Sequence, residues 1–349
     1  MKVKPKLLFI GNHFSSPKFN SNVYQEIPLR IEGIGWKSIV TSRVEHKFLR
    51  LVDMLWTILI NRNKYEIAII DVFSGFAFIW AEYSTFLLRL IKKPFILILR
   101  GGNLPAFSLK HKARVNRLLN KANSVYSPSH YLKNELRRFR SDISVIPNPI
   151  DVAAYNFRVR SSVEPTLLWL RAFHQIYNPT LAVDVLSDLS KTYAAVKLIM
   201  VGPDKGDGSL QEVMKKAEEL GVREKLLFPG QIPRNQVGEW LNKGDIVINT
   251  TNYDNTPVSV IEAMATGLCI VTTNAGGISY LVEHGKDGLI VPSNNPDAMT
   301  SAIIDILENL KLAETLSINA RKKAEKLDWS IILPQWEKAL HSVIPQREN

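Results

Sequence analysis

Residues 246–272 read IVINTTNYDNTPVSVIEAMATGLCIVT and decide how this part of the chain folds. Two short apolar runs, Ile246 to Asn249 and Cys269 to Thr272, are rich in β-branched residues, which predicts buried strands. A helix is predicted between them at Val258 to Thr266, and Gly267 is placed to end it. Strand, polar loop, helix and strand in this order form a βαβ unit, which builds parallel sheets.

The start of this helix is a candidate binding site. Thr256 is expected as the N-cap, and Pro257 suits the first helical position. Val258, Ile261 and Ala265 then follow as one apolar stripe. Unsatisfied backbone N–H groups and the positive end of the helix dipole favour phosphate at such a position. We therefore expect an anion site in the loop before residue 258.

The same alternation of short apolar and longer amphipathic runs extends outward over the whole chain. Two prolines, Pro147 and Pro149, interrupt it and indicate a hinge. Strands are predicted at 6–11, 36–41, 67–72, 95–99, 124–127, 144–146, 166–170, 196–201, 226–228, 246–249, 269–272 and 288–291. Helices are predicted at 23–32, with a late start or kink at Pro28, and at 179–190, 210–220, 234–242, 258–266 and 296–326. The pattern predicts two Rossmann-like, doubly wound α/β domains that face a cleft, with ligands at the carboxyl ends of the strands.

Size and composition agree with two soluble-type domains. The chain has 349 residues, of which 46% are hydrophobic and 22% charged. A single core stops growing near ~250 to 300 residues. The only cysteine, Cys269, lies in an apolar run, so a buried thiol is favoured over a reactive one. No apolar run approaches the ~20 residues of a membrane span, and the amino terminus lacks a secretory signal, so a cytoplasmic location is expected.

Positive charge is concentrated in the first half of the chain. Residues 1–160 contain 26 Lys and Arg and 10 Asp and Glu, a net charge of +16, whereas residues 161–349 have a net charge of −5. Two basic runs, 110–114 and 137–140, contribute to it. Two interpretations of this charge are open. The basic half either makes peripheral contact with the anionic inner face of the cell membrane or is simply a solvated basic surface. Nucleic acid is not expected as a partner because no helix-turn-helix, zinc or single-strand-binding signature accompanies the charge.

Two carboxylates accompany the predicted anion site. Glu262 stands in an apolar helix, where a carboxylate needs a hydrogen-bonding partner such as a ribose diol. Asp254 stands eight residues earlier, within reach of a sugar hydroxyl. The alternative is that Asp254 only stabilises the loop and that Glu262 pairs with a core Arg or Lys.

The segment 254–267 resembles the nucleotide-sugar motif of the retaining family 4 glycosyltransferases. The motif consists of an acidic residue, seven intervening residues, Glu, Ala-Met-Ala and Gly. The stretches 273–277 and 283–292 resemble the strand and loop that follow it in that family. Residues 127–129 and 145–151 resemble family patterns in the first domain and hinge.

The resemblance implies a type B glycosyltransferase fold with an acceptor-side domain at 1–155, a nucleotide-sugar domain at 156–326 and a final helix crossing back within 327–349. It implies that Glu262 binds the donor ribose, Asp254 the transferred sugar and Arg171 the diphosphate. These three are the expected catalytic residues. The expected donor-binding residues are Gly11, Ser21, Asn22, Arg171, Tyr177, Gly230, Asp254, Thr256, Pro257, Val258 and Glu262.

The sequence departs from the family pattern at several of these positions. Asp254 replaces the usual Glu, and Tyr177 replaces a Lys, which removes a cation from the diphosphate site; His174 or a residue of the basic half could compensate. Ser21 and Asn22 stand where the family has a Gly-Gly loop. Where the family often has a His, Arg100 is followed by Gly101 and Gly102. These three are expected on the acceptor side, unless Arg100 is only a surface residue at a strand end.

The expected activity is metal-independent transfer of a sugar, with retention of configuration, from a UDP-, GDP- or ADP-sugar to a glycan or lipid-linked acceptor. No other cofactor is expected, because the chain has no Asp-X-Asp, no zinc-type cluster and no G-x-G-x-x-G after the first strand. The main alternative is a catalytically weak or non-catalytic homologue that binds a glycan or a partner in the same cleft. A two-domain sugar-nucleotide epimerase is a third interpretation.

Overall fold

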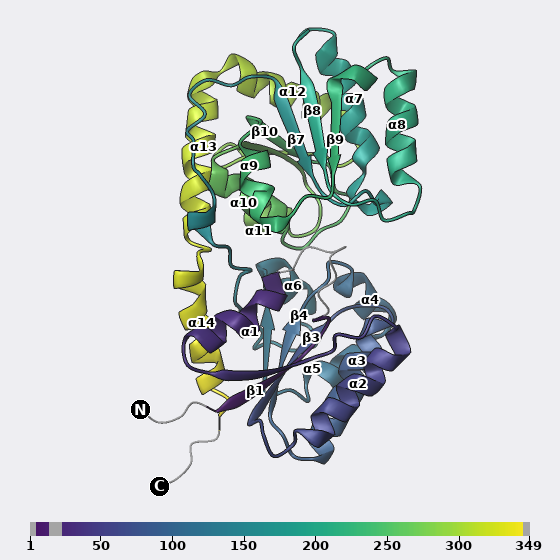
Figure 1. Cartoon of the computed structure of the whole chain (residues 1–349), viewed down its shortest axis with the longest axis vertical. Coiled ribbons are helices and arrows are strands. Elements are labelled where there is room, and N and C mark those ends of the chain that lie inside the picture. Colours follow the sequence, from purple (N-terminus) through teal and green to yellow (C-terminus); the bar gives the residue numbers. More distant parts are fainter. Residues whose placement is uncertain (1–4, 14–22, 345–349) are drawn as a thin grey trace. The chain divides into compact units, whose positions relative to one another are not determined.

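The computed structural model describes residues 5–13 and 23–344, so the predicted site residues Ser21 and Asn22 lie outside the described residues. The chain forms two compact units (Figure 1). Unit 1 comprises the described parts of Met1–Pro149 and Trp329–Asn349, and unit 2 comprises Ile150–Asp328. The chain therefore returns to unit 1 for its last helix.

Unit 1 contains a parallel sheet of six strands in the order β2-β1-β3-β4-β5-β6. Its strands are β1 (Lys6–Ile10), β2 (Lys37–Thr41), β3 (Ile67–Val72), β4 (Phe95–Leu99), β5 (Ser124–Ser127) and β6 (Ser144–Val145). Its helices are α1 (Val23–Gly33), α2 (Lys47–Ile60), α3 (Ala77–Leu90), α4 (Leu104–Lys110), α5 (Lys112–Leu119), α6 (His130–Leu136) and the final α14 (Trp329–His341).

Unit 2 contains a second parallel sheet of six strands in the order β12-β11-β10-β7-β8-β9. Its strands are β7 (Thr166–Leu170), β8 (Lys197–Val201), β9 (Leu226–Gly230), β10 (Ile246–Asn249), β11 (Cys269–Thr273) and β12 (Leu289–Val291). Its helices are α7 (Pro179–Ser190), α8 (Ser209–Glu219), α9 (Val237–Leu241), α10 (Val258–Thr266), α11 (Ile278–Leu281), α12 (Pro296–Glu308) and α13 (Leu310–Glu325), with short 3-10 turns that include η2 (Gln175–Tyr177) and η4 (Arg234–Gln236).

Each sheet is covered on both faces, which explains the mainly apolar character of its inner strands, such as β4 and β10. In β7, Leu167 and Trp169 belong to one buried cluster and Leu168 to another, because successive strand residues point to opposite faces. In β1, Leu8 and Leu7 divide in the same way. Both units are thus doubly wound, and the predicted fold class is confirmed.

The twelve strands lie where the apolar runs predicted them, but two helix predictions were wrong. The expected helix 296–326 is two helices, α12 and α13. Asn309 separates them with non-helical backbone angles (φ −119°, ψ 84°), and its side chain accepts the Leu312 N–H at the start of α13. The expected helix 234–242 is the 3-10 turn η4 followed by the short α9. Pro28 lies inside α1, and α1 begins at Val23.

Cys269 is fully buried in β11, as predicted. Burial raises the pKa of its thiol to about 12, because the thiolate is poorly solvated there. The thiol is therefore protonated at neutral pH and has a packing role.

Candidate functional site

The candidate site lies at the carboxyl edge of the unit 2 sheet, between β7 and β10. The chain winds outward from β7 to β8 and β9 and then returns to the other side of β7 as β10. This reversal is the topological switch point, where open α/β sheets bind ligands. Arg171 directly follows β7, and Asn249 ends β10. The strand order therefore brings together residues that lie almost 80 positions apart.

Arg171 is the central side chain of this site. It forms an ion pair with Asp254, and its Nε donates a hydrogen bond to Asn249 Oδ1 at 3.4 Å. Its guanidinium carbon lies 4.8 Å from the centre of the Tyr177 ring, a cation–π contact. Three expected site residues, Arg171, Tyr177 and Asp254, thus meet, and the Tyr177 ring packs against the arginine.

Hydrogen bonds hold the Tyr177 segment against the loop after β10. Thr250 Oγ1 donates to the Tyr177 carbonyl at 2.7 Å, and the Asn252 N–H donates to the Ile176 carbonyl at 2.8 Å. His174 caps the same turn, because its Nδ1 accepts the Ile176 N–H at 3.1 Å. His174 therefore shapes the turn that carries Tyr177.

Two glycines fix the loop that carries Asp254. The Gly277 N–H donates to the Asp254 carbonyl at 2.9 Å. A Cβ on Gly276 would lie 2.0 Å from that carbonyl oxygen, and one on Gly277 would lie 2.0 Å from the Asn255 carbonyl oxygen. No side chain fits at such distances, so both positions require glycine if the loop is to hold Asp254 beside Arg171.

The start of α10 differs from the prediction in its cap. Pro257, and not Thr256, occupies the N-cap, with extended backbone (φ −67°, ψ 114°) and no capping side chain, and the helix begins at Val258. Pro257 has no N–H to offer, so the next donors are those of Val258 and Ser259. In the described part of the chain neither of these N–H groups donates a hydrogen bond to protein. They are available to an anion.

Glu262 is 5% exposed and faces two residues that the sequence analysis missed. Tyr155 donates its hydroxyl to Glu262 Oε1 at 2.9 Å, and Arg234 Nη1 lies 3.6 Å from the same oxygen. The alternative of an arginine partner is therefore realised in part, although the Arg234 side chain is partly exposed and does not belong to the core. The sequence around Tyr155 or Arg234 does not predict a contact with Glu262, because the fold brings both residues to it from distant segments.

Gly230 ends β9 with a left-handed backbone (φ +74°). Its carbonyl accepts the Gly202 N–H at 3.0 Å. A Cβ on Gly202 would lie 1.7 Å from the Arg171 carbonyl oxygen, so the loops after β7, β8 and β9 are in contact. Gly230 thus lies at the same edge of the sheet as Arg171.

The equivalent edge of the unit 1 sheet carries a second Arg–Asp pair. Arg100 Nε donates to Asp71 Oδ1 at 2.8 Å, and its Nη1 donates to Asn148 Oδ1 at 3.3 Å. Arg100 is buried, so the alternative of a surface residue is wrong. A Cβ on Gly11 would lie 2.5 Å from Asp71 Oδ2, which explains the glycine. Gly101 follows Arg100 with φ +63°.

His13, just after β1, is another buried polar residue that the sequence analysis missed. Burial lowers the pKa of its imidazole, an effect that the Asp71 carboxylate opposes and the Arg100 guanidinium reinforces. His13 is therefore neutral at pH 7. The sequence pattern around a single histidine in a loop does not predict whether its side chain is buried. The burial of His13 is seen only in the tertiary structure.

Within 5–13 and 23–344, no three His, Cys, Asp or Glu side chains are grouped so that they could hold a metal ion. Over the same residues, none of the helices combines the length and apolar character required to cross a lipid bilayer.

The chain is similar in sequence to known glycosyltransferases. Residues 157–323 match the family described as "Glycosyl transferases group 1". An uncharacterized glycosyltransferase of Methanocaldococcus jannaschii is 24% identical over 84% of this chain and 82% of its own length. Several other curated relatives match over 19% to 61% of their own length.

Solved glycosyltransferase structures share the fold over 97% of this chain. Sucrose-phosphate synthase from Thermosynechococcus elongatus has a TM-score of 0.81 at 15% identity, and the match covers 99% of it. HepE of Anabaena, solved in complex with UDP-glucose, has a TM-score of 0.78 at 18% identity and is covered completely. The family resemblance and the type B glycosyltransferase fold predicted from the sequence are confirmed.

Proposed function

We propose, from the match of residues 157–323 to the group 1 glycosyl transferases and from the type B fold, that this chain transfers a sugar from a nucleoside-diphosphate sugar to a glycan or lipid-linked acceptor with retention of configuration. The observation that carries the proposal is Arg171, held by Asn249, Asp254 and Tyr177 at the switch point of the sheet. A cation at this position suits a diphosphate.

The donor would lie along the carboxyl edge of unit 2. Arg171 and the N–H groups at the start of α10 would bind the diphosphate, Glu262 the ribose, and the loop at Gly230 the base. Tyr155 and Arg234 orient the Glu262 carboxylate, so both are positioning residues in this proposal. HepE is solved with UDP-glucose, and we therefore propose a UDP-sugar as the first donor to test, ahead of GDP- and ADP-sugars.

In the proposed reaction the acceptor oxygen bonds to the anomeric carbon on the face from which the diphosphate leaves. The bond between that carbon and the phosphate oxygen breaks, and the departing phosphate takes the acceptor proton. The protein then has to position the two substrates and stabilise the charge on the leaving diphosphate. Arg171 and the helix amides supply that stabilisation without a bound metal, and Asp254 contacts the transferred sugar.

Unit 1 would receive the acceptor. Arg100, Gly101 and Gly102 follow β4 at its carboxyl edge and form the proposed acceptor side. Gly11 lies beside Asp71 at the same edge and keeps its proposed role in donor binding. Peripheral contact of the basic unit 1 with an anionic membrane belongs to this proposal. The inner leaflet is the expected one, since cytoplasmic leaflets carry the negative surface potential.

A non-catalytic homologue is the second candidate, and the Arg171–Asp254 pair favours it. The Asp254 carboxylate neutralises the cation that a diphosphate would use, and Tyr177 stands where the family has a further cation. Nucleotide release from UDP-, GDP- and ADP-sugars distinguishes the candidates. Transfer or hydrolysis with any of them supports the enzyme. Tight nucleotide binding without release from any of them supports the binding protein.

Thermal stability in the presence of UDP, GDP and ADP tests the donor site directly. A nucleotide at 100 times its Kd adds about 2.7 kcal/mol to the free energy of unfolding. Glu262→Ala should abolish this stabilisation because the ribose loses its acceptor. Glu212→Ala, at an exposed position of α8, is the control and should retain it. A full stabilisation in Glu262→Ala would contradict the ribose assignment.

A further inference from the structure

The outer side of α2 carries a row of large apolar side chains. Phe48, Val52, Trp56 and Ile60 follow one another at four-residue spacing, so they lie along one side of the helix. Their exposed fractions are between 49% and 62%. Helices of soluble proteins place such a stripe against the core, whereas here the core is contacted by other residues of α2, such as Met54.

The neighbouring helix α3 is apolar on its outer side as well. Tyr83, Phe86 and Leu90 are more than half exposed. The two helices pack against each other and run side by side in Figure 1. We call the exposed side chains of Phe48, Val52, Trp56, Ile60, Tyr83, Phe86 and Leu90 the apolar face of unit 1. Exposed apolar surface on this scale marks an interaction site.

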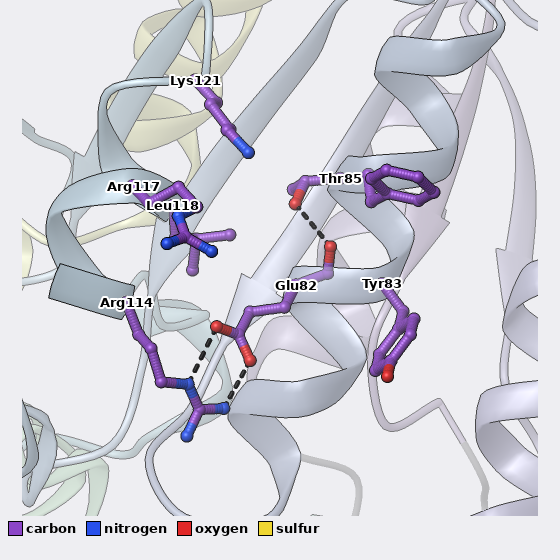
Figure 2. A pocket seen from close by; sticks show the side chains of 8 residues that line it. Glu82, Tyr83, Thr85, Arg114, Arg117, Leu118 and Lys121 are labelled. Atoms are coloured by element: carbon purple, nitrogen blue, oxygen red, sulfur yellow. Dashed lines mark hydrogen bonds and ion pairs between the residues drawn. The ribbon is translucent and has the colours of Figure 1, made fainter. Parts of the chain in front are cut away.

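A pocket of about 320 Å³ opens between α3 and α5 beside the apolar face. Figure 2 shows its two walls, with side chains of α3 on one side and basic side chains of α5 and the following turn on the other. The lining includes Glu82, Tyr83, Phe86, Arg114, Arg117 and Lys121. The pocket thus combines two exposed aromatic rings with three cations and one carboxylate.

The charges in this pocket do not balance. Glu82 is engaged by Arg114, whose Nε donates to Oε1 at 2.9 Å and whose Nη2 contacts the other carboxylate oxygen. Within the described residues, Arg117 and Lys121 form no ion pair. The pKa of the Lys121 amine is lowered, first by loss of solvation and then by the neighbouring cations Arg89 and Arg117, while Glu82 acts in the opposite direction. An anion in the pocket would relieve this repulsion.

We propose that the pocket binds the phosphate headgroup of an anionic phospholipid while the apolar face enters the same leaflet. The volume is within the range of small-ligand sites. Aromatic and aliphatic side chains flanked by Arg and Lys are the composition of helices that lie at membrane interfaces. A protein partner fits less well, because Lys is depleted from protein interfaces. The inference specifies the membrane contact of the proposed function, on which it rests.

Co-sedimentation with vesicles tests this inference on the full chain. We expect binding to phosphatidylcholine vesicles that contain 30% phosphatidylglycerol and at least tenfold weaker binding to pure phosphatidylcholine. Arg117→Gln with Lys121→Gln should weaken binding about 30-fold, since each cation at an anionic leaflet contributes about 1 kcal/mol. Trp56→Ser with Phe86→Ser should weaken it at least tenfold, because two aromatic rings no longer enter the leaflet.

The matched control is Arg137→Gln with Arg138→Gln, which removes the same charge from exposed positions outside the pocket. It should change binding less than threefold. If the control variant lost as much vesicle binding as Arg117→Gln with Lys121→Gln, the headgroup site would be overturned. Absence of vesicle binding together with concentration-dependent dimerisation would overturn it in favour of a second copy of the chain.

Stabilisation by UDP, measured without vesicles, separates this inference from the proposed function. The pocket variants should keep the full UDP effect. Failure of the wild-type chain to bind the anionic vesicles while it still binds UDP counts against the lipid site alone. Failure of the wild-type chain to bind any nucleotide counts against the donor site and leaves the vesicle result to stand by itself.

Discussion

Both units place an Arg–Asp pair at the carboxyl edge of the sheet, but the two pairs differ in their surroundings. Arg100 and Asp71 both belong to the ends of neighbouring strands, and their side chains are 8% and 6% exposed. Arg171 and Asp254 are 13% and 16% exposed, and Asp254 stands in a loop. The first pair is enclosed by Gly11 and Asn148. A ligand can therefore compete for Arg171 much more readily than for Arg100.

The largest expected effect is on stability and comes from the enclosed pair. Arg100→Ala should lower the free energy of unfolding by about 3 to 5 kcal/mol, because it leaves the Asp71 carboxylate buried without its cation. Urea denaturation measures it. Arg137→Ala, at an exposed position, should change stability by less than about 0.5 kcal/mol. Equal stabilities of the two variants would show that the Arg100 pair is not structural.

The second prediction concerns catalysis at the more open pair. Arg171→Ala should lower kcat about 10²- to 10³-fold, since the leaving diphosphate loses a preorganised cation. Steady-state kinetics with a sugar nucleotide that supports transfer by the wild-type chain measures it. The variant should unfold within about 1 kcal/mol of wild type, because Asp254 can still reach water. A stability loss as large as that of Arg100→Ala would make the two pairs equivalent.

A smaller effect is expected when the competing carboxylate is neutralised. Asp254→Asn should bind UDP about fivefold more tightly, because the diphosphate no longer competes with Asp254 for Arg171. Sugar transfer should fall at the same time, since Asp254 is assigned to the transferred sugar. Calorimetric titration with UDP gives the affinity, with Glu212→Gln as the control. Weaker UDP binding in Asp254→Asn would show that the ion pair assists the donor.

The smallest expected effect is that of metal removal. Because Arg171 and the α10 amides take the charge of the diphosphate in the proposed mechanism, excess EDTA should leave the transfer rate unchanged within about twofold. The assay uses wild-type protein with and without added Mg²⁺ or Mn²⁺. A rate that depends on either ion would mean that Arg171 does not neutralise the leaving group by itself.

Local pattern was sufficient for most of the fold. Runs such as Phe95–Leu99 and residues 246–248 are buried on both faces of a parallel sheet, so their continuous apolar character marks them without knowledge of their neighbours. Gly267 ends α10 in the left-handed conformation (φ +75°), as its position predicted. The break at Asn309 was missed because the apolar periodicity continues across it.

Part of the candidate site was likewise predictable from local sequence, and part depended on the tertiary structure. The motif from Asp254 to Gly267 is contiguous, so the sequence by itself determined the family resemblance, the helix and the expected roles of Asp254 and Glu262. Only the tertiary structure decided that Asp254 pairs with Arg171, that Tyr155 and Arg234 meet Glu262, and that Arg100 is buried. These contacts depend on which strands are neighbours and on how separate loops meet. Periodicity and capping describe only the immediate surroundings of each residue and leave that order open.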